Sequence, residues 1–65
     1  MTSTKFFATH VEVAMIEAAR NGSLHTVERN GVLTISENGR VLIEAYQPST
    51  AMRSRINEIM ERAAR

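Results

Sequence analysis

The chain has no cysteine, and this absence limits both its stabilisation and its chemistry. Disulfides, thiolate zinc sites and thiol nucleophiles are excluded. A domain of 65 residues buries only about 60% of the surface that its unfolded chain exposes, so its core alone provides little stability. We therefore expect self-association, as a homodimer, to add stability.

Long apolar runs and an excess of one charge are missing as well. No run approaches the ~20 residues of a membrane span, and the start of the chain lacks the features of a secretion signal. The chain has eight basic residues, seven glutamates and no aspartate, and positive and negative charges alternate along it. A nucleic-acid binder usually carries a clustered basic stripe, so nucleic acid is possible but not favoured. We expect a cytoplasmic protein that does not contact a membrane.

The dipeptide Asn-Gly occurs three times between residues 21 and 39. Asn and Gly tolerate the positive φ of tight turns, so Asn-Gly between alternating apolar residues is a strong hairpin signal. Strand-like runs follow the three dipeptides, at residues 24–29, 32–36 and 40–46. The pattern predicts a three-stranded antiparallel meander.

The register of the second hairpin decides which apolar side chains face the core. Two-residue turns at both Asn-Gly sites would divide the apolar residues of the second and third strands between the two faces. A three-residue turn at 37–39, with Gly39 left-handed in a bulge, would unite them. We therefore expect one apolar face that carries Leu33, Ile35, Val41, Ile43 and Ala45.

The register of the first hairpin is open between two alternatives. A two-residue turn sends Leu24 and Thr26 to the core, and a three-residue turn sends His25 and Val27 there. Val27 mildly favours the second alternative.

A helix is expected before the strands, from about residue 10 to Arg20. Thr9 and Glu12 fit a capping box at its start, and Gly22 suits the left-handed position after its end. A helix that begins four or five residues earlier, through the phenylalanines, is the alternative.

Two apolar residues of this helix lie off its core stripe. Val13 and Ile16 fall on the opposite side, between glutamates, where a surface helix is usually polar. They form a ridge that another chain could cover, or the helix is buried on most sides.

A second helix is expected after Pro48, from about Thr50 to Ala64, with Ser49 as its N-cap. Its core stripe comprises Met52, Ile56, Ile59, Met60 and Ala63. Glu58 with Arg62, and Glu61 with Arg65, have the favourable i,i+4 order of an ion pair.

These elements predict one α+β domain over residues 1–65, in the order α-β-β-β-α. Each helix has one apolar stripe and the sheet has one strongly apolar side, so both helices should pack on that side. The opposite face should carry Val32, Thr34, Ser36, Leu42, Glu44 and Tyr46.

This order and length resemble the double-stranded-RNA-binding domain, which grips phosphates with a basic cluster at the start of its last helix. The equivalent stretch here contains Arg53 and Arg55. HicA-type toxins use the same fold as small ribonucleases and have Gly-Ser-His at the start of the first strand. Residues 22–25, Gly-Ser-Leu-His, are similar to that element with the histidine one position later. The resemblance implies RNA binding or RNA cleavage as an alternative function, and Arg53 and Arg55 with Arg62 are also candidates for DNA binding.

The catalytic hypothesis depends on His25. This residue could act as general acid or base in RNA cleavage, with Arg29 on a phosphate and Glu44 as the opposing base. Strands one and three of a meander are not neighbours, so His25 and Glu44 would lie about 9–10 Å apart. We favour a structural histidine and predict no catalytic residue.

No metal or cofactor site is expected. His10 and Glu12 diverge on a helix, and no glycine-rich loop precedes a helix.

We therefore expect a non-enzymatic protein-interaction module. It would regulate or inhibit a larger host protein or nucleoprotein complex, as many small phage and mobile-element proteins do. The candidate contact residues are Val13, Ile16, Leu42, Glu44, Tyr46, Arg53 and Arg55.

Overall fold

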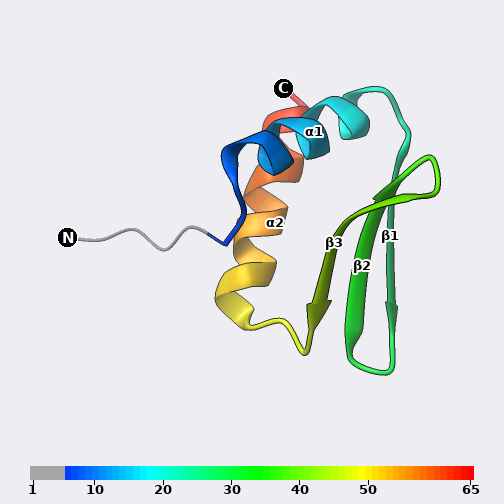
Figure 1. Ribbon diagram of the computed structural model, residues 1–65. Helices are drawn as coiled ribbons and strands as arrows, with labels where there is room; N and C mark the ends of the chain where they lie inside the picture. Colours follow the sequence, from blue (N-terminus) through cyan, green and yellow to red (C-terminus); the bar gives the residue numbers. More distant parts are fainter. Residues whose placement is uncertain (1–5) are drawn as a thin grey trace.

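A computed structural model describes residues 6–65 of the chain. The elements are helix α1 (Thr9–Arg20), strands β1 (Leu24–Arg29), β2 (Val32–Glu37) and β3 (Arg40–Tyr46), and helix α2 (Thr50–Ala63) (Figure 1). The strands form one antiparallel sheet in the order β1-β2-β3. The predicted α+β fold with α-β-β-β-α order is confirmed.

Both hairpins close with two-residue Asn-Gly turns. Asn30 and Gly31 have φ of 51° and 80°, and Asn38 and Gly39 have φ of 49° and 84°. These left-handed pairs are the geometry of type I′ turns, whose twist matches that of the flanking strands. The expected three-residue turn at 37–39 is wrong, because Asn38 itself adopts the left-handed conformation.

A bulge inside β3 restores the apolar face that the short turn would have divided. Ser36 pairs with Val41, but Ile35 pairs with Ile43, so Leu42 is the extra residue. Ile43 and Ala45 thereby share the face of Leu33 and Ile35, as predicted.

The bulge also corrects two expectations about β3. Val41 lies before the bulge and stays on the opposite face, 55% exposed, although it was expected in the core. Leu42 was expected on that opposite face, but it is half-buried and packs against the core.

In the first hairpin the two-residue turn sends Leu24 and Thr26 to the helix-covered side. Arg29 pairs with Val32, and Thr26 pairs with the buried Ile35. His25 and Val27 therefore point to the other face, where Val27 is 50% exposed. The preference for Val27 in the core is wrong.

Helix α1 begins without the predicted capping box. Its N-cap is Ala8, which makes no side-chain cap hydrogen bond, and the Glu12 carboxylate bonds to Arg55 instead. The helix ends as expected. Gly22 has φ of 74°, and the Ser23 amide donates to the Ala18 carbonyl over 2.9 Å, which completes a Schellman motif.

Helix α2 begins with the predicted cap, because the Ser49 hydroxyl accepts a hydrogen bond from the Met52 amide over 3.1 Å. The predicted pairs of Glu58 with Arg62 and Glu61 with Arg65 are not among the ion pairs of residues 6–65. Glu58 lies 3.4 Å from Arg55 instead.

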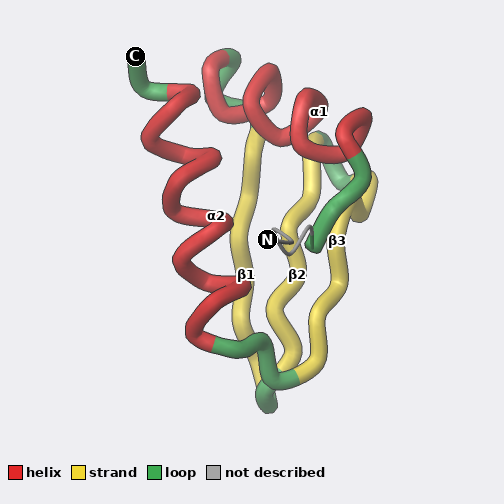
Figure 2. Tube along the Cα trace, turned by 90° about the vertical axis from the view of Figure 1, so that its left-hand side faces the viewer, coloured by secondary structure: helices red, strands yellow, loops and turns green. Residues whose placement is uncertain are grey.

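The core lies between the helices and one face of the sheet. Met15, Ile35 and Ile59 are fully buried there, and Phe7 joins them. Both helices lie on the same side of the sheet, with α1 across one end of the strands and α2 along the outer side of β1 (Figure 2). The other face of the sheet, which we call the open face, carries neither helix.

Candidate protein-binding site

The open face is ordered by cross-strand pairing into three rows. The rows are His25, Ser36 and Val41; Val27, Thr34 and Glu44; and Arg29, Val32 and Tyr46. Three of these side chains are large, apolar and at least half exposed: Val27 at 50%, Val41 at 55% and Tyr46 at 73%. The rows place Ser36, Thr34 and Glu44 among them, so the three share one face without forming a contiguous apolar patch.

Glu44 and Tyr46, two predicted contact residues, lie on this face. The Tyr46 hydroxyl donates a hydrogen bond to Glu44 Oε1 over 3.2 Å. Leu42, the third candidate from β3, is half-buried and belongs to the core side.

His25 also lies on the open face, in the edge strand β1. Glu44 is two strands away and in the next row, so the two side chains are separated by at least about 9 Å, twice the ~4.8 Å strand spacing. A general acid and a general base must each come within hydrogen-bond reach of the substrate atom they serve, about 3 Å or one bridging water away. The register thus places His25 and Glu44 on one face but does not bring them together.

Two of the arginines proposed as phosphate contacts, Arg53 and Arg55, are engaged by carboxylates. Arg53 donates two hydrogen bonds to Glu28, over 2.9 and 2.7 Å, and Arg55 donates two to Glu12, over 3.2 and 2.8 Å. These bonds raise the pKa of both guanidinium groups. Neither arginine is available to a phosphate without the loss of a bidentate pair.

The Glu28–Arg53 pair gives fold stability a dependence on pH. The hydrogen bonds from Arg53 lower the pKa of the Glu28 carboxyl below its ordinary value. A carboxyl with a lowered folded-state pKa stabilises the fold above its unfolded pKa, about 4.3 for Glu, and loses that contribution as the pH falls through the folded-state pKa.

We therefore expect Glu28→Gln to lower stability slightly at neutral pH and to have no effect well below pH 4.3. Urea unfolding of both proteins across this range measures the difference. Glu61→Gln, at a glutamate without an ion pair in residues 6–65, corrects for the loss of one carboxylate. A deficit of the Glu28 variant that persists in acid would contradict this role of the pair.

Of the predicted ridge on α1, Val13 is 46% exposed, as expected. Ile16 is half-buried and contacts the core, so it only partly belongs to the exposed side.

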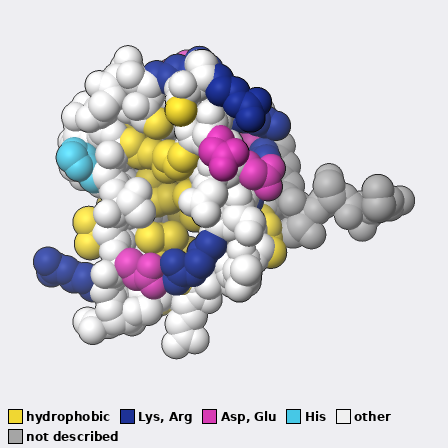
Figure 3. Space-filling view, turned by 180° about the vertical axis from the view of Figure 1, so that it is seen from behind, with side chains coloured by type: hydrophobic (Ala, Val, Ile, Leu, Met, Phe, Trp, Pro, Cys, Tyr) yellow, Lys and Arg dark blue, Asp and Glu magenta, His cyan; other side chains and the backbone are white. Residues whose placement is uncertain are grey.

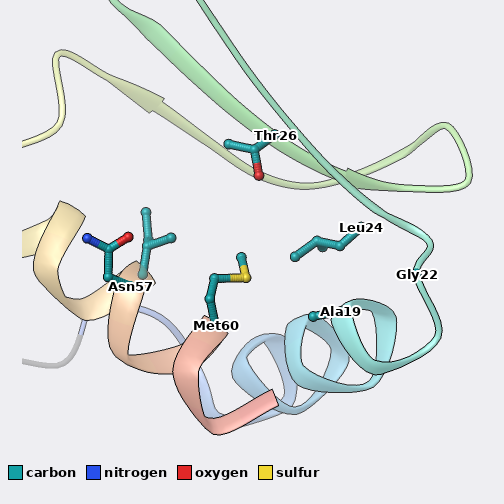
Figure 4. A pocket seen from close by; sticks show the side chains of 7 residues that line it. Ala19, Gly22, Leu24, Thr26, Asn57 and Met60 are labelled. Carbon is teal, nitrogen blue, oxygen red and sulfur yellow. The ribbon is translucent and has the colours of Figure 1, made fainter. Parts of the chain in front are cut away.

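A groove runs between β1 and α2, on the side of the sheet that the helices cover. It consists of two hollows of about 320 and 330 Å³ that share Thr26, Ile56 and Asn57. Figure 4 shows Thr26 and Leu24 from β1 facing Met60 and Asn57 from α2 across one of them. Apolar side chains are exposed in this depression (Figure 3). We call it the β1–α2 groove.

The groove borders the free backbone edge of β1. In a hairpin closed by a two-residue turn, the two residues that flank the turn exchange both backbone hydrogen bonds. Here these residues are Arg29 and Val32, and from Arg29 backward every second residue of β1 bonds to β2. Val27 and His25 therefore bond to β2, whereas the N–H and C=O groups of Leu24, Thr26 and Glu28 point outward. Within residues 6–65, no other backbone group pairs with these outward groups.

This groove was not predicted from the sequence. Thr26 belongs to one of the two alternatives for the core side of the first strand, and Asn57 lies outside the predicted apolar stripe of the last helix. Asn57 lies between the apolar stripe residues Ile56 and Ile59, and Thr26 lies on the core side of β1. These polar residues are a weak signal that α2 and β1 do not pack tightly together.

Two negative findings concern the described part of the chain. Residues 6–65 contain no group of three or more His, Asp or Glu side chains that could hold a metal ion. None of the helices within these residues is long and apolar enough to cross a membrane.

Comparison of the chain with family models, with curated proteins and with solved structures finds no significant match.

Proposed function

We propose that this protein is a non-enzymatic interaction module that binds one extended segment of a larger partner protein on the free edge of β1, and thereby regulates or inhibits that partner. The observation that carries the proposal is the opening of this edge onto the β1–α2 groove. The outward backbone groups of Leu24, Thr26 and Glu28 have no partner in the sheet and can pair with an added strand, and the groove beside them offers apolar surface.

An extended segment satisfies both features at once. Its backbone pairs with the outward groups of β1, and every second side chain enters the groove, because side chains of a strand alternate between the two faces. Thr26 and Asn57 can donate and accept hydrogen bonds in the middle of the groove, while Leu24, Ile56 and Met60 supply its apolar walls. The Glu28–Arg53 pair lies at the other end of the groove.

The β1 strand of a second copy fits this edge poorly. In Figure 2, α2 extends outward past β1, so a strand added to β1 lies beneath α2. A second copy related by a two-fold axis would bring its own α2 into the same space. For a homodimer, which stays a prediction, we propose the open face with Val27, Val41 and Tyr46, and light scattering at micromolar concentration tests it.

Thr26→Pro tests the proposal, because it removes the outward amide at the centre of the edge. A photo-crosslinking residue at position 57 captures the partner from a host lysate, and the same residue at position 41 reports on the open face. We expect a crosslinked partner from position 57 that disappears in the Thr26→Pro protein and persists in His25→Ala, whose change lies on the opposite side of β1. A partner that crosslinks equally well in the Thr26→Pro protein would overturn strand addition.

A further inference from the structure

A second groove lies between α1 and α2, toward the ends of both helices. It has a volume of about 400 Å³ and is lined by Val13, Ile16, Glu17, Arg20, Arg62 and Arg65. None of these residues lines the β1–α2 groove. We call it the interhelical groove, and it is independent of the proposed strand-binding edge.

The lining of the interhelical groove is strongly cationic. Among residues 6–65, its lining has three guanidinium groups, from Arg20, Arg62 and Arg65, and one carboxylate, from Glu17. None of the three arginines forms an ion pair with another side chain of residues 6–65. Basic side chains gather at the end of the molecule where the helices terminate (Figure 3). Like charges that line one groove repel one another, and an anionic partner would relieve the repulsion.

This arrangement differs from the first half of α2. There Arg53 and Arg55 are each held in a bidentate pair with a glutamate. Arginines in the last turn of a helix also stabilise the helix dipole. That role accounts for Arg20 and Arg62, which lie in the last turns of α1 and α2, but not for Arg65, which follows α2, or for the exposed Val13 in the same groove.

The floor of the groove is apolar. Val13 is 46% exposed, and Ile16 next to it is half-buried. No aromatic side chain of residues 6–65 lines the groove, so this part of the chain offers no platform there on which a nucleic-acid base could stack. An apolar floor with an arginine rim fits a partner that carries apolar side chains and carboxylates together.

We propose that the interhelical groove binds an acidic amphipathic helix of a partner protein. Apolar side chains of that helix, spaced three or four residues apart, cover Val13 and Ile16. Its glutamates and aspartates accept hydrogen bonds from Arg20, Arg62 and Arg65, whose planar guanidinium groups suit bidentate binding of carboxylates.

The test uses a synthetic peptide of about four helical turns. It consists of Glu, Leu and Ala and is arranged to give one apolar face. Three control probes accompany it: a scrambled peptide of the same composition, a peptide with Lys in place of Glu, and a single-stranded RNA of equal charge. Titration of isotope-labelled protein, followed by amide chemical shifts, gives both affinity and location. We expect the acidic amphipathic peptide to bind most tightly and to shift the amides of residues 13–20 and 62–65.

Matched charge reversals identify the surface. Arg62→Glu should weaken binding of the acidic peptide at least about tenfold, whereas Arg40→Glu, the same change at an exposed arginine at the start of β3, should weaken it less than about twofold. Val13→Ser should also weaken binding while leaving the Arg rim intact. Equal losses in both charge variants, equal binding of the scrambled peptide, tighter binding of the RNA, or no shifts in the two helices would each overturn the proposal.

Discussion

Replacing Ile59 with alanine is expected to lower the free energy of unfolding by about 2–5 kcal/mol. Ile59 is fully buried in the core between the helices and the sheet, so the truncation leaves a cavity that its neighbours can fill only in part. A domain of 65 residues has a total stability of about 3–10 kcal/mol, which makes this loss a large share of the whole. Thermal unfolding followed by circular dichroism should show Tm lowered by at least about 10 °C.

Val13→Ala is the matched control, because it also removes an aliphatic side chain from a helix. Val13 is 46% exposed, and alanine is the better helix former, so we expect a change within about 0.5 kcal/mol. If Ile59→Ala were as mild as this control, the core would not lie where the fold places it.

Proline at two neighbouring positions of β1 is expected to have opposite outcomes. The Val27 amide points to β2 in the register of the first hairpin, so Val27→Pro removes a ladder bond and leaves a carbonyl of β2 unpaired. The expected loss is about 2–4 kcal/mol, a large share of a total stability of about 3–10 kcal/mol. The Thr26 amide points to the free edge, where proline is tolerated, so Thr26→Pro should stay within about 1 kcal/mol of the wild type.

Urea unfolding of the two proline variants measures this contrast. The same measurement is needed for the crosslinking experiment from position 57, because Thr26→Pro can report on strand addition only if the protein still folds. The reverse order of stabilities would mean that the register of β1 is shifted by one residue.

The turns and the strands were predictable from sequence because Asn-Gly carries a local conformational preference that needs no tertiary contact. The position of the bulge was not. Val41, Leu42 and Ile43 are all apolar, so the alternation does not say which of them is the extra residue. The pairing of Ile43 with Ile35 decides the position of the bulge, and that pairing exists only once the sheet has formed.

The start of α1 shows the same limit for side-chain chemistry. Thr9 and Glu12 match a local capping box, but Glu12 bonds to Arg55, 43 residues further along the chain. A bidentate interhelical pair takes up the Glu12 carboxylate, and no local pattern predicts it.

The candidate site was predictable only in part. Tyr46 and Glu44 lie on the predicted face, and Val13 is exposed, because strand alternation and helical periodicity place such residues directly. The β1–α2 groove depends on where α2 lies relative to β1. This placement is a property of the assembled fold, and the polar Asn57 between Ile56 and Ile59 is only a weak sign of it in the sequence.

The free edge of β1 is best tested by amide hydrogen exchange, measured by NMR on the protein alone. We expect fast exchange at Leu24, Thr26 and Glu28 and slow exchange at His25, Val27 and Arg29, in strict alternation. Slow exchange at all six amides, or alternation in the opposite sense, would show that this edge is already occupied or faces the other way, and would contradict strand addition at β1.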